Sequence, residues 1–389
     1  MTDAALSMSG MLADSAASFV ARKYGFARRN QRLTEDLGPD SALWKEFAEL
    51  GWLACLVPEE HGGLGGGALE MAALMEVFGS ALLVEPVLSS AVFATRLLSA
   101  LDVPAASDVL PRMAAGECQL AVAYAEAGAR TGIDSIESSL VTGHAGSLVL
   151  SGRKIVVLGA PTAEQLVVSA RFGDSDRLSL LLVDPRTPGV VMTHYRTIDG
   201  REAADVTFSN VNLAAGALLS HDGGCALSLA LDWAAIAACA ELLGCMEETI
   251  RISAEYARTR HQFGQPIGSF QSIKHLLAAM ATQRLLARAM LARGVEALGE
   301  TDDIRRARMV SAARNCIARA ADFVTANGIQ VHGGIGMTEE YVVGHHYKRA
   351  LVLSELFGSA EFHRERFARL TRATDDETSF PQSGHPDAV

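Results

Sequence analysis

The segment RTRHQFGQPIGSFQSIKHLLAAMA, residues 258–281, joins two long helical patterns through one short turn. Before the turn, residues 227–263 contain no proline and have helical periodicity, and after it the helical pattern resumes at residues 272–298. Two more helical patterns, at residues 304–334 and around 351–367, predict an up-and-down bundle of four long helices over residues 225–371. By spacing alone, the turn is compatible with an ordinary interhelical loop in which Phe263 and Phe270 fill the core and the arginines face solvent.

The chain before the bundle divides into two further parts. Residues 1–118 show mainly helical patterns, such as DSALWKEFAELGW at 40–52 with Asp40 or Ser41 as the N-cap. Residues 119–217 consist of short Val- and Leu-rich runs separated by Gly, Asp, Pro and Ser, which predict a compact β domain. The expected fold class is therefore α+β multidomain. Residues 372–389 are polar, contain two prolines, and are expected to be a disordered tail.

Composition excludes several classes of function. The formal net charge of −11 argues against a nucleic-acid or anionic-membrane partner. We find neither a secretory signal nor an apolar run of the roughly 20 residues that crosses a bilayer. The six cysteines form no CxxC pair, so neither a metal site nor a disulfide framework is expected. These features predict a cytoplasmic protein.

A second glycine-containing segment, GIQVHGGIGMTEEY at residues 328–341, follows a helical pattern. A Gly-Gly pair lets backbone N–H groups approach a phosphate closely, although most such pairs simply end a helix. Taken in this order, the two segments resemble the acyl-CoA dehydrogenases. The matching residues are Arg260, Phe263, Gly264, Ile267, Gln271, Gln330, Gly333, Gly334 and Gly336. PEEHGGLGGG at 58–67 and LSGRKIVVLGA at 150–160 also match, so the resemblance covers nearly the whole chain.

The resemblance implies a fold, a reaction and a cofactor. The fold is a helical N-terminal domain, a middle β-barrel-like domain and a C-terminal four-helix bundle. Members remove two hydrogens from an acyl-CoA thioester, passing the β-hydrogen as hydride to FAD, and an electron-transfer flavoprotein reoxidises them. The implied cofactor-binding residues are Arg260, Phe263, Gln271, Gln330, Gly333, Gly334, Ser359 and Thr131, with Arg260 and Phe263 contacting the FAD of a neighbouring subunit. The hydroxyls usual around the flavin ring are partly missing, because Ala125-Glu126 and Val156-Val157-Leu158 stand at those positions.

The catalytic base expected from the resemblance is missing as well. In LVLSELFGSAEFHRERF, residues 351–367, Phe357 stands where many members carry the catalytic glutamate. The alternative position on the first bundle helix holds Ala234. A positioned base contributes roughly 10²–10⁴ in rate. The weak candidates to replace it are Asp232, which an offset of two residues turns about 200° away from Ala234, and Glu355 and Glu361, which are typical of surface or capping carboxylates.

Three functions stay open at this point. The chain resembles the small subunit of pimeloyl-CoA dehydrogenase and related actinobacterial chains, which predicts one subunit of an α2β2 dehydrogenase whose partner supplies the glutamate. A self-sufficient homotetramer with a relocated base is the second possibility. A non-catalytic acyl-CoA-binding or scaffold protein is the third. The branch suggests dicarboxyl-CoA or steroid side-chain thioesters as substrates, and the sequence does not choose between them.

Overall fold

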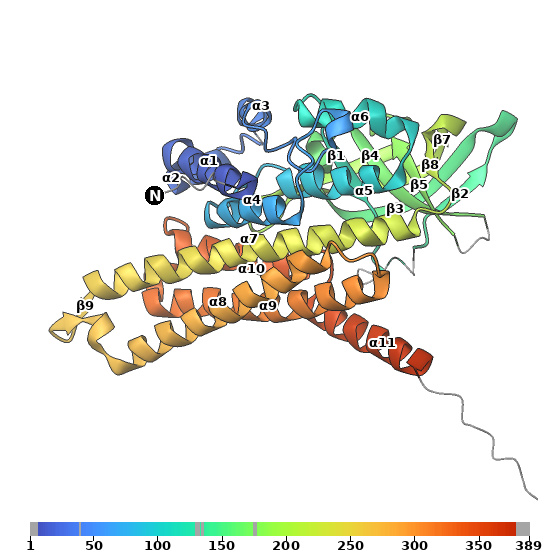
Figure 1. The fold of residues 1–389 in the computed structure, drawn as a ribbon. Coiled ribbons are helices and arrows are strands. Elements are labelled where there is room, and N and C mark those ends of the chain that lie inside the picture. The colour runs from blue at the N-terminus through green and yellow to red at the C-terminus, as the bar shows by residue number, and fades with distance from the viewer. Residues whose placement is uncertain (1–6, 39, 129–132, 134–135, 174–176, 379–389) are drawn as a thin grey trace, which may run out of the picture.

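The computed structural model describes residues 7–38, 40–128, 133, 136–173 and 177–378. Figure 1 shows the N-terminal helices above one long helix, α7, with the remaining bundle helices below it and the sheet packed at one end. Since α7 lies between the N-terminal helices and the bundle, its buried residues belong to the same hydrophobic core as theirs.

The N-terminal part is helical, as predicted. Asp40 caps the third helix, accepting hydrogen bonds from the backbone N–H groups of Ala42 and Leu43. An aromatic cluster fills the centre, where the Phe47 and Trp52 rings lie 5.0 Å apart. The helices are α1 Met8–Lys23, α2 Phe26–Thr34, α3 Ser41–Glu49, η1 Glu59–His61, α4 Ala68–Ser80, η2 Val87–Ala94 (a π-helix), α5 Thr95–Leu101 and α6 Pro104–Ala114.

The middle part is one eight-stranded sheet with strand order β6-β7-β3-β2-β4-β5-β8. The remaining strand, β1, pairs in parallel with β4, beside the residues of β4 that pair with β2. The strands are β1 Leu120–Ala123, β2 Ser139–Thr142, β3 Leu148–Leu158, β4 Gln165–Phe172, β5 Leu178–Val183, β6 Val190–Arg196, β7 Glu202–Leu213 and β8 Leu218–Ser220, with single 3-10 turns at η3 His144–Gly146, η4 Ala160–Thr162 and η5 Ala215–Ala217.

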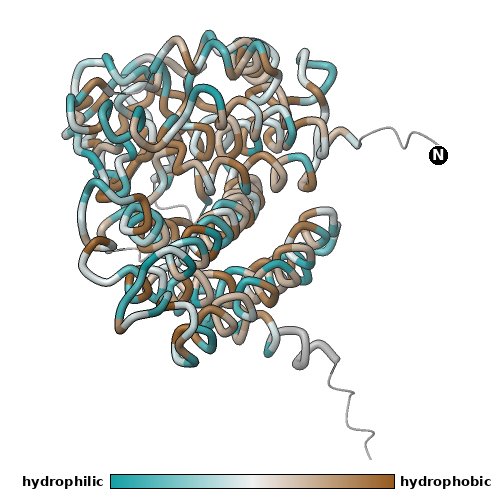
Figure 2. The backbone as a smooth tube through the Cα atoms, turned by 90° about the vertical axis from the view of Figure 1, so that its left-hand side faces the viewer, coloured by the Kyte–Doolittle hydropathy of each residue, from teal (hydrophilic) through white to brown (hydrophobic). Residues whose placement is uncertain are grey.

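The C-terminal part is a bundle around α9, which contacts α7, α8, α10 and α11. Figure 2 shows brown, hydrophobic turns recurring beside teal, hydrophilic ones along these helices, as expected of helices with one buried face. The elements are α7 Gly224–Thr259, β9 His261–Gln262, β10 Gln265–Pro266, η6 Ile267–Ser269, α8 Gln271–Ala297, α9 Asp303–His332, η7 Gly333–Met337, α10 Val342–Glu355 and α11 Ala360–Thr378.

The α+β multidomain fold is confirmed, with three corrections. The helical pattern around residues 351–367 is split between α10 and α11, which are separated by residues 356–359. Residues 372–378, predicted to belong to a disordered tail, are part of α11, and residues 379–389 lie outside the described residues. α7 is long and apolar enough to cross a membrane, which we did not expect, but 78% of its most apolar window is buried inside the fold. The domain boundaries at 118, 119–217 and 225–371 stay predictions.

A buried ionic cluster joins the three parts of the chain. Glu241 of α7 pairs with Arg201 and with Arg349 of α10. Arg349 Nε also lies 2.6 Å from Asp199 Oδ2, as an ion pair without hydrogen-bond geometry. From the N-terminal helices, Arg29 donates to the carbonyl of Asp199 at 2.7 Å. Each of these charged residues is at least 93% buried, so the cluster holds the three parts in one arrangement.

Candidate active site

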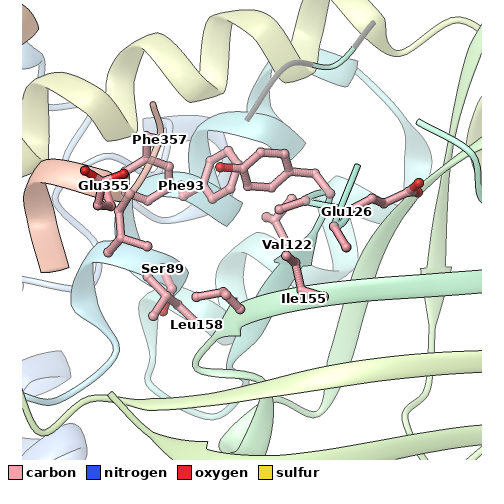
Figure 3. Close-up of a pocket in the computed structure, with 13 residues that line it drawn as sticks. Ser89, Phe93, Val122, Glu126, Ile155, Leu158, Glu355 and Phe357 are labelled. Atoms are coloured by element: carbon pink, nitrogen blue, oxygen red, sulfur yellow. The ribbon is translucent and has the colours of Figure 1, made fainter. Parts of the chain in front are cut away.

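An apolar cavity of about 230 Å³ lies where the three parts of the chain meet. We call it the inner cavity. Figure 3 shows Phe357 and Glu355 at one end of it and Glu126 at the other. Its described walls contain no basic side chain. They are formed by Ser89, Phe93, Val122, Tyr124, Ala125, Glu126, Ala127, Ile155, Val156, Leu158, Glu355, Leu356 and Phe357.

Two residues with a strained backbone face each other across the inner cavity. Val156 of β3 has φ 50°, and Phe357, in the loop between α10 and α11, has φ 58°. A side chain rarely adopts this left-handed conformation, which is least favourable for bulky or β-branched residues. Such strain persists only where the surroundings impose it and often gathers at functional sites, which makes this cavity a candidate site.

Contacts from α9 and α11 hold the strained loop. Arg314 donates to the carbonyl of Leu356 at 2.8 Å and to that of Leu353. On the other side, the His363 ring nitrogen Nε2 lies 3.0 Å from the carbonyl of Phe357, which assigns the proton to Nε2. Burial lowers the pKa of His363 to about 3, so the ring stays neutral. The Phe357 side chain is thereby fixed over the cavity and is only 7% exposed.

The opposite wall is anchored by a buried lysine. Lys154 Nζ lies 2.6 Å from Glu126 Oε1 and 3.0 Å from Ser169 Oγ. Burial lowers the pKa of Lys154 to about 8, against the opposing effect of Glu126. Glu126 also accepts hydrogen bonds from the backbone N–H groups of Glu137 and Ser138. Its carboxylate therefore links Lys154 to the backbone at Glu137 and Ser138, which is a structural role.

A second cavity of about 290 Å³, the outer cavity, lies between α7, α9 and α11. Phe357 lines both cavities, so its ring is the partition between them. Asp232 also lines the outer cavity, but its carboxylate pairs with Arg306 at 3.2 Å and with Arg366 at 2.7 Å. Arg306 contacts Oδ2 and Arg366 contacts Oδ1, so both oxygens of this carboxylate already have arginine partners.

The other base positions are now placed. Ala234 is wholly buried in the core and lines neither cavity. Glu361 lies on the surface of α11, where it pairs with Arg364. Glu355 is exposed, lines the inner cavity, and has no hydrogen bond or ion pair within the described part of the chain. Of the three candidates, only Glu355 combines access to the inner cavity with a free carboxylate.

The residues that the resemblance implies for binding FAD away from its flavin ring gather at the end of the bundle remote from the inner cavity. Figure 1 shows the β9–β10 hairpin, which carries Phe263, at the end of α7 remote from the sheet. The Tyr256 and His332 rings, 4.5 Å apart, bring the end of α9 to the same place. Six of the predicted residues are therefore neighbours here, and all are exposed: Arg260, Phe263, Gln271, Gln330, Gly333 and Gly334.

Ser359 and Thr131 differ from this group. Ser359 lies beside the inner cavity in the α10–α11 loop, where its hydroxyl accepts a hydrogen bond from the Phe362 N–H at 3.2 Å and so caps α11. Thr131 lies outside the described residues. The binding roles of all eight residues stay predictions.

The two ends fit different parts of FAD. The apolar inner cavity fits a flat ring but offers it few side-chain donors. At the hairpin, Arg260 is exposed and makes no ion pair within the described residues, and Gly333 and Gly334 leave open space beside their backbone. This suits an anionic pyrophosphate. Asp232 of α7 lines the outer cavity together with Phe357, and the 28 residues from Asp232 to Arg260 correspond to about 42 Å of helix. The two groups of residues therefore fit FAD only if two chains share it.

Sequence reasoning missed several wall residues. Ser89 and Phe93 lie in an apolar run that is typical of any core helix. Tyr124 comes directly before the Ala125-Glu126 pair that matches the family motif and is not itself part of that motif. Lys154 carried a usable signal, because a lysine amid Ile and Val in a predicted strand must find a buried partner. No group of three or more His, Cys, Asp or Glu within the described residues could hold a metal ion.

Comparison with known proteins gives three adjacent matches. The models for the N-terminal, middle and C-terminal domains of acyl-CoA dehydrogenases match residues 9–117, 121–211 and 222–371. Among curated proteins, the acryloyl-CoA reductase (NADH) of Anaerotignum propionicum is 29% identical, with 84% of this chain and 85% of that protein covered. Acyl-CoA dehydrogenase IpdE2 of Mycobacterium tuberculosis is also 29% identical, covering 90% and 92%.

Among solved structures, the ChsE4–ChsE5 complex from Mycobacterium tuberculosis has a similar chain. Its TM-score is 0.83 at 24% identity, with 98% of this chain and 100% of that chain covered. At this identity the likeness shows the shared fold alone.

Proposed function

The chain belongs to the acyl-CoA dehydrogenase family, and on that premise we propose that it works as one subunit of a heteromeric, FAD-dependent acyl-CoA dehydrogenase whose partner chain supplies the catalytic carboxylate. It is an oxidoreductase that acts on acyl-CoA thioesters, and family membership implies a flavin cofactor. We also propose that it is a cytoplasmic protein that passes electrons to an electron-transfer flavoprotein.

The observation that carries the proposal is the position of the Phe357 ring. Phe357 lines both cavities, and no protonation state lets its ring accept a proton. We propose that it stands at the position where the family carries its base. Ala234, at the alternative position, is buried away from both cavities. The α-proton of a substrate in this chain's own inner cavity therefore meets an aromatic ring.

The split of the cofactor-binding residues supports shared sites. A bound flavin supplies the hydride acceptor for the reaction. This chain's hairpin, with the exposed Arg260 and the 91% exposed Phe263, is proposed to hold the pyrophosphate side of FAD whose ring lies in a neighbouring subunit. The chain thereby completes a site in which the partner performs the deprotonation.

Exposed apolar side chains on the bundle support a stable subunit contact. Leu285 and Leu286 of α8 are 57% and 51% exposed, and Met337 of η7 is 73% exposed. Leu285 and Leu286 are adjacent in α8, and adjoining exposed apolar side chains mark an interaction surface more often than scattered ones do. The structurally similar ChsE4–ChsE5 protein is likewise a complex.

A self-sufficient enzyme is the second candidate, favoured by Glu355. Its carboxylate is free and lines the inner cavity beside Phe357. In that case Glu355 removes the α-proton within this chain, and no partner carboxylate is needed.

The test separates the two candidates. Dehydrogenation of a panel of acyl-CoA thioesters is measured for the purified chain reconstituted with FAD. The same assay is run on the chain co-expressed with a dehydrogenase chain that carries the catalytic glutamate. Activity only in the co-expressed complex supports the heteromer. Activity in the isolated chain that is lost in Glu355→Gln but kept in the matched surface variant Glu361→Gln supports the relocated base and rejects the heteromer. A colourless, inactive complex rejects both.

A further inference from the structure

The wall of the inner cavity is shaped by an irregularity in β3. Lys154 pairs with Val206 of β7, and Val157 pairs with Ala204, so Ile155 and Val156 together stand opposite the single residue Asp205. This is a β-bulge, a device that bends a strand and redirects its side chains, often beside active sites. Both bulge residues line the inner cavity.

In the bulge, the backbone N–H groups of Ile155 and Val156 are not paired with β7, so each needs a different hydrogen-bond acceptor. The Ile155 N–H donates to the carbonyl of Ala125 at 2.9 Å. The Val156 N–H donates to Asp205 Oδ1 at 3.2 Å. The second acceptor is a side chain, so a single substitution can remove it.

Asp205 is itself held in place by its neighbours. The Tyr195 hydroxyl of β6 donates to Asp205 Oδ1 at 2.9 Å, and Arg153 donates to Oδ2 at 2.9 Å. Oδ1 therefore serves the bulge and Tyr195, whereas Oδ2 serves an arginine side chain that is 65% exposed. The two oxygens have separable roles.

We propose that Asp205 is a positioning residue that holds the Ile155–Val156 bulge in its strained conformation, so that these side chains form the wall facing the flavin ring. Valine does not favour the left-handed conformation that Val156 adopts at φ 50°. The carboxylate that accepts its N–H, in a place where the sheet offers none, is the contact that favours this backbone. The part of the proposal that concerns flavin rests on the proposed function, and the part that concerns the backbone does not.

Hydrogen exchange on the full chain tests the backbone part without flavin. In Asp205→Ala, amide exchange in the segment 153–158 should accelerate about tenfold, because the loss of one hydrogen bond to a charged group changes an equilibrium constant by about that factor. Asp205→Asn keeps the Oδ1 acceptor and should retain the protection. Arg153→Gln loses only the ion pair and is the matched control. Unchanged exchange in Asp205→Ala, or equal acceleration in all three variants, overturns the proposal.

A rescue variant guards against simple misfolding. Glycine adopts φ 50° without steric cost, so adding Val156→Gly to Asp205→Ala should recover part of the thermal stability that Asp205→Ala loses. Failure of the double variant to recover any of it contradicts the role of Asp205.

The part of the proposal that concerns flavin is tested by measuring the FAD affinity of the co-expressed complex. Asp205→Ala should weaken it about tenfold relative to Asp205→Asn. Flavin absent from every variant, the wild type included, rejects the proposed function and leaves the exchange result to judge Asp205. Bound flavin with equal affinity in Asp205→Ala and Asp205→Asn overturns the contribution of Asp205 to the ring wall.

Discussion

The rings of Phe93 and Phe357 meet edge to face, with centroids 5.4 Å apart and an interplanar angle of 78°. Phe93 makes a second edge contact with Tyr124, at 5.6 Å. This row of three rings runs from the α10–α11 loop through η2 to the end of β1. Phe357 is thus built into an apolar packing that involves all three parts of the chain.

The ring pair itself should be measurable. A double-mutant cycle with Phe93→Leu and Phe357→Leu should give a coupling energy of about 0.5–1.5 kcal/mol, the usual value for an edge-to-face pair. Urea unfolding of the four proteins measures it. Phe78 contacts Phe47 and Trp52 instead, so a Phe78→Leu and Phe93→Leu cycle should be additive. If the coupling energy of the Phe93–Phe357 pair is no larger than that of this control, the edge-to-face contact does not contribute to stability.

Restoring a carboxylate tests what the Phe357 substitution did to the chemistry. In the isolated, FAD-reconstituted chain, Phe357→Glu should dehydrogenate an acyl-CoA roughly 10²–10⁴ times faster than Phe357→Gln. The glutamine variant has the same size and loses the same ring contacts but cannot take the proton. Equal rates for the two variants, with flavin bound in both, would show that the missing base is not what limits this chain.

Assembly should depend on the apolar face of α8. Leu285→Glu places a charge on the exposed patch beside Leu286 and should reduce the size of the purified complex in analytical ultracentrifugation, because an unpaired buried charge is costly. Val191→Glu on β6 is the control, since Val191 is also exposed, at 61%, but lies on the sheet. An unchanged sedimentation coefficient for Leu285→Glu would remove this face from the interface.

The fold could be predicted from the sequence because its signals are local. Helical periodicity marks α7, α8 and α9, and regular turn residues mark the strands. The site was less accessible, since its shape depends on long-range contacts. The sequence predicts that Phe357 replaces the base, and this stays a prediction. Its position between the two cavities depends on contact with Phe93, more than 260 residues away, and the local pattern does not reveal that contact. The left-handed Val156 opposes valine's own preference and is explained by Asp205 on another strand.

The buried ionic cluster is expected to contribute strongly to stability. Glu241→Gln leaves Arg201 and Arg349 without their shared carboxylate, and removing one partner of a buried pair costs about 3–5 kcal/mol. Glu361→Gln breaks the exposed pair with Arg364 and should cost at most about 1 kcal/mol. Free energies of unfolding in urea provide the comparison. Similar losses for the two variants would mean that the cluster does not tie the three parts together.

Acid should destabilise the fold through His363. Burial lowers its pKa from an ordinary value of 6.5 to about 3. Between these values the unfolded chain binds a proton that the folded chain does not, so the free energy of unfolding falls as the pH falls through this window. The contribution approaches about 1.4 kcal/mol per pH unit. Below pH 3 both states are protonated, and this group adds no further slope.

A variant without the ring isolates that contribution. His363→Asn cannot take up the proton, so its free energy of unfolding should decline less steeply than that of the wild type between pH 6.5 and 4. Buried His346, whose pKa is also lowered to about 3, is present in both proteins and cancels in the difference. His194→Asn, at an exposed position, is the matched control. If His363→Asn and the wild type have the same slope, the ring is not held neutral beside the carbonyl of Phe357.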